Sequence, residues 1–272
     1  MKNNIIFSFL FMLLLSCSKD DIEKYPFVDI QSIPLICKEY YSNSLNQEYS
    51  YTSARLLYEI KSKWIYTVYT YNNVDQVVSY DKYFDLGLAS LDPETVQQSY
   101  NRTEWVTPEN TEINRRANYT YSNNKLTKHE ITLLTTGEIT YYTYEHDKNG
   151  RISKRTYFHE NQPSQSDEFL YDDKGNLITE VRNHINNGIP VMVRKIVYGF
   201  DDKNNPYIVF QRLLEPGVYS NRNNIIKEVC TLYTGIPSED EIQETNYTYE
   251  YNSDGYPIKR DNEITLEYLP LK

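Results

Sequence analysis

The sequence predicts an all-β protein, an antiparallel meander of about seven repeated hairpins that form one long, twisted and curved sheet. Three observations support this. The chain has 28 tyrosines but 9 phenylalanines, 3 methionines and 2 tryptophans. The tyrosines alternate with polar residues over short runs, and the runs end in Asn-, Asp- and Gly-rich turns. Tyrosine favours strands and buries its ring while its hydroxyl stays hydrogen-bonded. A barrel or a two-layer sandwich is the alternative arrangement.

A tyrosine-rich strand followed by a polar turn and an apolar residue recurs along the chain. The run "YTYEYNSDGYPIKR" is its last clear copy. Two successive intervals, from Tyr144 to Tyr171 and from Tyr171 to Tyr198, are both 27 residues long. A fixed period indicates a repeated supersecondary unit, here a hairpin. The copies lie near Tyr71, Tyr121, Tyr144, Tyr171, Tyr198, Tyr219 and Tyr251.

Four residues are the expected structural determinants of the hairpin turns. Gly150, Gly175 with Asn176, and Gly255 each follow a tyrosine-rich run. Glycine and asparagine accept the positive φ that short hairpin loops require. After each turn, charged residues alternate with apolar ones, which indicates a second strand with one solvated face.

The repeat is interrupted twice. In residues 85–117 one unit is replaced by other structure, and Asp92 followed by Pro93 predicts a short helix near 92–100. Aspartate is a favoured N-cap, and proline fits the first helical position. The stretch 212–224 is a second departure from the repeat and is expected to form a loop.

The N-terminus has the pattern of an export signal. Residues 1–16 contain a basic residue, Lys2, and then an apolar run from Ile5 to Leu15. The run is too short to span a bilayer, which takes about 20 residues. It is typical of a signal peptide. Together with Cys17 it resembles a bacterial lipobox, which implies that Cys17 is lipidated after cleavage.

The residues after Cys17 are acidic and resemble the export signal of Bacteroidetes surface lipoproteins. This resemblance implies a protein anchored by lipid to the outer membrane and exposed on the cell surface. We expect a flexible tether at 17–26 and a single β domain at 27–272. The export signal consists of Ser18, Lys19, Asp20 and Asp21.

The turns also resemble the YD repeats of the Rhs family. The run from Tyr171 to Leu177, "YDDKGNL", matches that pattern best, and looser copies begin at Tyr144 and Tyr249. The likeness covers roughly residues 65–268. It is shared by small Bacteroidetes lipoproteins with YD-like hairpins. It implies a repeated-hairpin architecture. Rhs proteins enclose a cargo with many more repeats, so that role is not implied here.

Composition and motifs argue against several functions. The formal net charge of −10, with interspersed signs, disfavours nucleic-acid binding. The four histidines lack metal-ligand spacing and are expected at the surface, and we expect no metal and no cofactor. Paired carboxylates such as Asp172–Asp173 and Asp201–Asp202 fall in turns and are expected to cap the backbone. Cys37 and Cys230 could pair outside the cell or remain as buried free thiols.

We therefore expect a non-enzymatic surface protein that binds a glycan or another protein. The binding surface would be a sheet face together with the 85–117 insertion, because specificity often lies where a scaffold is interrupted. Trp64, Trp105 and Tyr100 are the candidate ligand-binding residues. A polysaccharide-degrading hydrolase, which would need two carboxylates across a cleft, and a structural partner of an outer-membrane complex are the alternatives.

Overall fold

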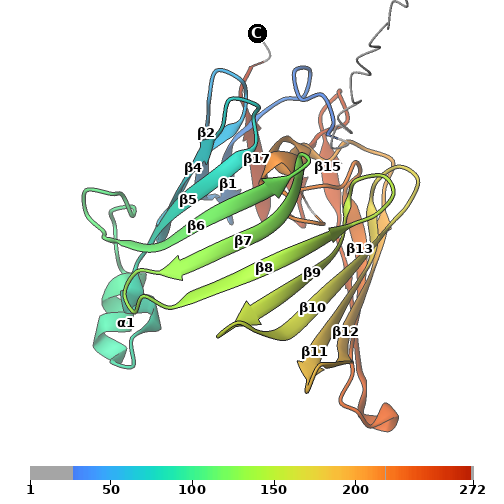
Figure 1. The fold of residues 1–272 in the computed structure, drawn as a ribbon. Coiled ribbons are helices and arrows are strands. Elements are labelled where there is room, and N and C mark those ends of the chain that lie inside the picture. The colour runs from blue at the N-terminus through green and yellow to red at the C-terminus, as the bar shows by residue number, and fades with distance from the viewer. Residues whose placement is uncertain (1–26, 218, 271–272) are drawn as a thin grey trace, which may run out of the picture.

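The structure is a computed structural model that describes residues 27–217 and 219–270. These residues form one antiparallel sheet of 17 strands (Figure 1). The predicted all-β meander is confirmed. The predicted helix is confirmed as α1 (Pro93–Tyr100), in which the Asp92 carboxylate accepts a hydrogen bond from the backbone N–H of Thr95.

The strands follow one another along the chain with short connections. The first nine strands are β1 (Ile36–Tyr41), β2 (Ser44–Tyr51), β3 (Leu57–Ser62), β4 (Ile65–Tyr71), β5 (Val77–Phe84), β6 (Ile113–Ser122), β7 (Lys125–Leu133), β8 (Ile139–His146) and β9 (Ile152–His159). The others are β10 (Gln162–Tyr171), β11 (Leu177–Asn186), β12 (Ile189–Phe200), β13 (Ile225–Leu232), β14 (Glu241–Asn246), β15 (Tyr249–Tyr251), β16 (Pro257–Arg260) and β17 (Ile264–Tyr268). Three short 3-10 helices are η1 (Leu86–Ala89), η2 (Pro206–Leu213) and η3 (Pro237–Glu239).

The sheet curls so far that its two edge strands, β14 and β15, follow one another in the sequence. Strands β1 to β14 pair in chain order. Strand β1 also pairs with β17, which continues through β16 to β15. No ladder joins β14 to β15 in the described chain, so the sheet is open and is not closed into a barrel. All strands belong to one sheet, so the sandwich alternative is wrong as well.

The connections gather at two ends of the sheet (Figure 1). One end, called the turn end, carries the repeat turns, at 52–56, 72–76, 147–151, 172–176 and 252–256. The other, called the helix end, carries η1 and α1 between β5 and β6. The described chain starts and finishes at the turn end, where the backbone N–H of Leu269 donates to the carbonyl of Leu35.

The first polar residue of each repeat turn closes that turn. The Oδ1 of Asn252 accepts hydrogen bonds from the backbone N–H groups of Asp254 at 3.1 Å and Tyr256 at 2.9 Å. Asp147 and Asn72 do the same in their turns. The third residue after it takes a positive φ, which glycine adopts without steric penalty. The φ values are 78° at Gly150, 94° at Gly175 and 77° at Gly255, but also 64° at Arg55 and 62° at Asp75.

Tyrosine hydroxyls connect several hairpins to an earlier strand of the sheet. Tyr71, at the end of β4, donates to the carbonyl of Leu57, the first residue of β3, at 2.8 Å. The sheet has a register shift beside that tyrosine, so the hydroxyl provides a partner for a carbonyl of a buried residue. The same bond joins Tyr51 to Ile36, Tyr121 to Val77, Tyr171 to Ile152, Tyr249 to Ile225 and Tyr268 to Pro257.

A segment without strands fills the concave face of the sheet at the turn end. This inner segment comprises η2 and the following residues 214–217 and 219–224. Phe210 is 1% exposed, and its ring lies 5.2 Å from that of Tyr49 and 5.4 Å from that of Tyr219. Leu214 packs in a second cluster with Leu126, Ile152, Phe169 and Leu177. The predicted loop at 212–224 is therefore part of the core.

Replacing Tyr71 with phenylalanine should remove one tyrosine–carbonyl bond and leave the carbonyl of Leu57 without that partner. We expect the free energy of unfolding to fall by about 1–2 kcal/mol, the range for an unmet buried hydrogen bond. Urea denaturation measures this change. The control is Tyr58→Phe, since Tyr58 is 44% exposed, and it should change the free energy by less than about 0.5 kcal/mol. Equal effects of both substitutions would contradict this account.

Candidate functional site

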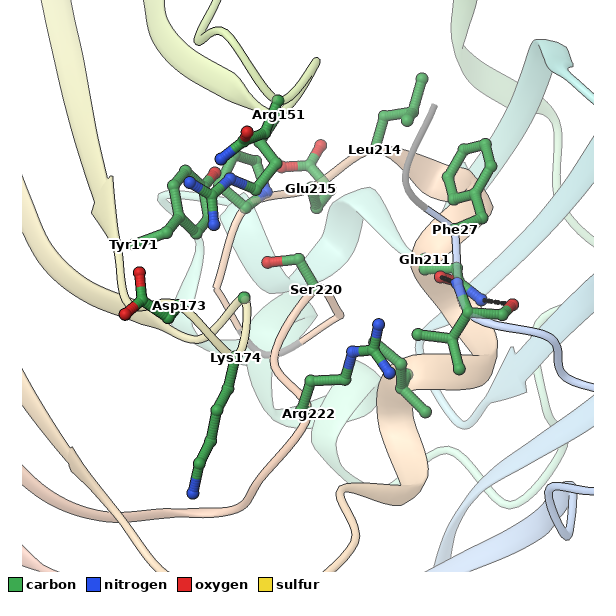
Figure 2. A pocket seen from close by; sticks show the side chains of 15 residues that line it. Phe27, Arg151, Tyr171, Asp173, Lys174, Gln211, Leu214, Glu215, Ser220 and Arg222 are labelled. Atoms are coloured by element: carbon green, nitrogen blue, oxygen red, sulfur yellow. Dashed lines mark hydrogen bonds between the residues drawn. The ribbon is translucent and has the colours of Figure 1, made fainter. Parts of the chain in front are cut away.

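A cavity of about 350 Å³ lies at the turn end, between the inner segment and two of the repeat turns. The turns are 147–151, between β8 and β9, and 172–176, between β10 and β11. Phe27 and Val28, the first described residues, form the opposite wall. Figure 2 shows these groups around the opening. The cavity is therefore built by segments that are distant in sequence.

Hydrogen bonds fix the inner segment to the turn after β10. Asn176 is buried, and its Oδ1 accepts from the backbone N–H groups of Arg222 at 2.8 Å and Asn223 at 3.0 Å. In return, the Oδ1 of Asn221 accepts from the backbone N–H of Leu177 at 2.7 Å. On the opposite wall, Gln211 makes hydrogen bonds to both backbone groups of Val28, with distances of 2.6 and 2.7 Å. The walls of the cavity are thus held in place before any ligand binds.

Two of the five charged side chains around the cavity have ion-pair partners. Arg151 pairs with Asp147 at 2.8 Å, and its guanidinium lies 4.6 Å from the centre of the Tyr171 ring. Glu215 pairs with Arg155 at 3.2 Å. Arg222 is exposed and, like Lys174, has no carboxylate within ion-pair distance among the residues described. Figure 2 shows it extending into the cavity toward Gln211, whereas Lys174 points away.

A buried network of charges lies on the concave face beside the cavity. Asp167 is 1% exposed and accepts from Arg155 at 2.8 Å and from Arg182 at 2.7 Å. Burial alone would raise the pKa of Asp167, but the hydrogen bond from Arg182 and the charge of Arg155 lower it below its ordinary value. Through Arg155 the network continues to Glu215 in the inner segment. It therefore couples the sheet to the cavity wall.

His129 corrects the expectation that all four histidines are surface residues. It is buried on the concave face and stacks on Tyr119 with ring centres 4.2 Å apart. Burial, followed by the nearby charge of Arg155, lowers the pKa of His129 to about 4. The ring is therefore neutral at physiological pH and acts as one more aromatic side chain.

The candidate ligand-binding residues from the sequence lie at the helix end, away from the cavity. The indole N–H of Trp64 donates to the carbonyl of Ser99 in α1 at 3.2 Å. Trp105 follows the helix, and its carbonyl accepts from the side chain of Asn110. Tyr100 is the last residue of α1, but its side chain lies outside the description. Residues 113–117 of the expected insertion belong to strand β6.

Of the predicted turn residues, Gly175 lines the cavity. Gly150 and Asn176 belong to the two turns that border it, and Gly255 lies in another turn at the same end. Cys17 and the export signal at 18–21 lie outside the described residues, as do the signal peptide and the whole tether at 17–26. Cys37 and Cys230 are free thiols, so the pairing alternative is wrong.

Among residues 27–217 and 219–270, no cluster of histidine, cysteine, aspartate or glutamate could hold a metal ion. In the same part of the chain, none of the helices has the length and apolarity required to cross a membrane.

Sequence reasoning missed the residues that build the cavity. Arg222 and Glu215 lie in a stretch expected to be a loop, and nothing in its pattern indicates that it folds into the concave face. Asp167 and Arg155 are alternating charged residues in strands, which usually indicates a solvated face. An available signal was the apolar run "YIVF" at 207–210, immediately before that stretch.

No protein-family model and no curated protein matches the chain. Among solved structures, the chain is similar to a porin-like protein from Bacteroides uniformis, with a TM-score of 0.41 and 9% identity over 86% of this chain and 96% of that chain. A porin-like protein from Bacteroides vulgatus gives a TM-score of 0.38 and 11% identity over 88% of this chain and 100% of that chain. The TcdB2-TccC3 structure gives 0.31 and 13%, over 82% of this chain but 11% of that chain. Similarities at this level carry no statement about function.

Replacing Asp167 with asparagine should leave Arg155 and Arg182 without their shared carboxylate. We expect a loss of about 3 kcal/mol in the free energy of unfolding, as for breaking a buried ion pair. Glu145→Gln is the control, because Glu145 pairs with Lys154 at 3.7 Å on an exposed site. It should change the free energy by less than about 0.5 kcal/mol.

The same variant tests a pH dependence. The pKa of Asp167 is lower in the folded protein than in the unfolded chain, where it is about 3.9. Its ionised form therefore stabilises the fold above that value, and this stability is lost as the pH falls through the folded pKa. Between about pH 5 and pH 2, urea midpoints should fall more for the wild type than for Asp167→Asn. Parallel curves would contradict the assignment.

Proposed function

We propose that this protein is a non-enzymatic, lipid-anchored surface protein that binds a small polar ligand, such as the end of a glycan, in the cavity at the turn end. The observation that carries the proposal is Arg222, a cation that extends into a preformed cavity and has no carboxylate partner among the described residues. The volume of about 350 Å³ lies at the lower end of the range for ligand pockets.

The chemistry of the lining suits a sugar better than an apolar ligand. Phe27, Leu214 and Pro216 contribute apolar surface, while Ser220, Gln211 and Arg222 contribute polar groups. Polar and apolar groups contribute to the lining in similar measure, which suits the hydroxyl groups and ring faces of a sugar. Of the carboxylates at the cavity, Glu215 is paired with Arg155. This engagement favours binding over the two-carboxylate chemistry of a hydrolase.

The position of the anchor is compatible with a surface role. Residues 18–26 alone separate Cys17 from Phe27. A lipid on Cys17 would hold the turn end near the membrane and direct the helix end away from it. The glycan or protein binding that the sequence indicated for the helix end is less favoured, because the indole N–H of Trp64 is already bonded to Ser99.

Lipidation is tested by replacing Cys17 with alanine. Cells fed a labelled fatty acid should incorporate label into the wild-type protein and not into the variant. Cys37→Ala is the matched control and should keep the label, because the lipobox resemblance involves Cys17. Labelling of the Cys17 variant would rule out the proposed anchor.

Ligand binding is tested with a glycan array probed by the purified protein. We expect a selective hit whose affinity falls about tenfold or more in Arg222→Gln, since the ligand loses a charge-assisted hydrogen bond. Lys148→Gln is the control, because Lys148 is exposed in the neighbouring turn and does not line the cavity. Absence of hits, equal loss in the control, or cleavage of the glycan by the protein would overturn the proposal.

A further inference from the structure

An aromatic band crosses the concave face from β4 to β9. Adjacent rings lie between 4.2 and 6.3 Å apart, centre to centre. Tyr69 lies nearest the inner segment and packs against its apolar cluster, whereas Tyr80, Tyr142 and Tyr157 keep some exposure. The band comprises Tyr69, Tyr80, Tyr119, His129, Tyr142 and Tyr157.

Two cations lie beside this band, one step nearer the helix end. Lys82 of β5 is paired directly with Arg115 of β6 in the ladder, and Tyr80 is paired with Ala117. Because side chains alternate along a strand, Lys82 and Arg115 share the concave face with Tyr80. Both are half-buried. Strands β5 and β6 lie side by side in Figure 1.

Neither cation has a carboxylate within 4.0 Å among residues 27–217 and 219–270. The Nε of Arg115 is buried and has no hydrogen-bond partner in the same part of the chain. Glu215 is the acidic group whose charge acts on Lys82, but its carboxylate is bound by Arg155 at 3.2 Å. The positive charge of the pair is therefore not neutralised locally.

Three other arginines of this face are neutralised, in contrast to the pair. Arg155 and Arg182 share Asp167, and Arg194 pairs with Glu180 at 2.6 Å. Even Arg116, the next residue after Arg115, pairs with Asp81 at 2.7 Å on the outer face. Like charges directly opposite each other in a sheet are destabilising. A local arrangement that works against stability is characteristic of functional sites.

We propose that Lys82 and Arg115 form a binding site for the carboxylate or sulfate group of an acidic sugar. Guanidinium and ammonium groups bind oxyanions through charge-assisted hydrogen bonds. The exposed part of Tyr80, two residues from Lys82 on the same face, offers ring surface for the body of the sugar. This site is separate from the cavity at the turn end and does not depend on the ligand proposed there.

The electrostatics of the pair support this assignment. Burial, and then the charge of Arg115, lower the pKa of Lys82 from its ordinary value. Burial also raises the pKa of Tyr80 to about 12, against the opposing effect of Arg115, so that hydroxyl stays protonated and neutral. A bound oxyanion would relieve the repulsion between the two cations and favour the charged form of Lys82.

The test is calorimetric titration of the purified protein with glucuronate, glucose 6-sulfate and neutral glucose. We expect at least one charged sugar to bind about tenfold or more tightly than glucose. The affinity should fall as the salt concentration rises. Whichever charged sugar binds better identifies the source of the oxyanion. No preference for either charged sugar over glucose overturns the proposal.

Variants connect the binding to the cation pair. Lys82→Gln and Arg115→Gln should each weaken binding of the charged sugar about tenfold or more, while Lys82→Arg should retain it. Arg116→Gln, on the outer face of the same strand, and Arg222→Gln, in the cavity, should leave it unchanged. Lys82→Gln should not lower the urea midpoint, because it removes a repulsion. An equal loss in Arg116→Gln, or unchanged binding in Lys82→Gln, refutes the site.

Discussion

The bond between a tyrosine hydroxyl and the carbonyl at the start of the preceding strand is the interaction on which this fold depends. It occurs where the ladder shifts register beside a turn, as between Tyr71 and Leu57. A strand end in that position leaves a carbonyl without its ladder partner, and a buried polar group must be satisfied. Tyrosine meets this need and buries its ring at the same time. This explains why the chain uses 28 tyrosines where most proteins use aliphatic residues.

The second constraint is that a single curved sheet has nothing to pack against. Here the chain supplies its own packing partner, the inner segment, which joins two apolar clusters on different parts of the sheet. Phe210 belongs to the cluster with Leu57 and Leu266, and Leu214 belongs to the cluster with Leu126 and Phe169. Asparagines attach the same segment to the turn after β10. The cavity is the space that remains between these attachments, so its shape is set by the fold.

Much of the fold could be predicted from local chemistry. Alternating tyrosines, glycine turns and the Asp92–Pro93 start of α1 act within a few residues, and most of them predicted the observed element. The hairpin expected near Tyr219 was wrong, because Tyr219 lies in the inner segment and not in a strand. The hairpin of β2 and β3 was missed, and in its turn Arg55 occupies the left-handed position that glycine takes in several other turns. A better signal was the distance between the last residue of one strand and the first apolar residue of the next. This distance is six residues in the hairpins that continue at Leu57, Val77, Ile152 and Leu177.

The site could not be predicted in the same way. Arg222 reaches the cavity because residues 206–224 fold back over the sheet, and that placement depends on contacts between residues far apart in sequence. Asp167, Arg155 and His129 look like solvent-exposed residues of ordinary strands, because burial by a distant segment leaves no local periodicity. The insertion at 85–117 was expected to determine binding because it interrupts the repeat. The cavity instead lies beside the second interruption, at 212–224.

The inner segment has a consequence for how such proteins can change in size. In most hairpins the bond partner is an earlier strand of the same sheet, so the repeat by itself could be lengthened by duplication without any new chemistry. The concave face, however, is filled by one segment of fixed volume that contacts strands on both sides. Adding a hairpin would widen the face and leave part of it unfilled. The number of repeats and the length of residues 206–224 must therefore evolve together.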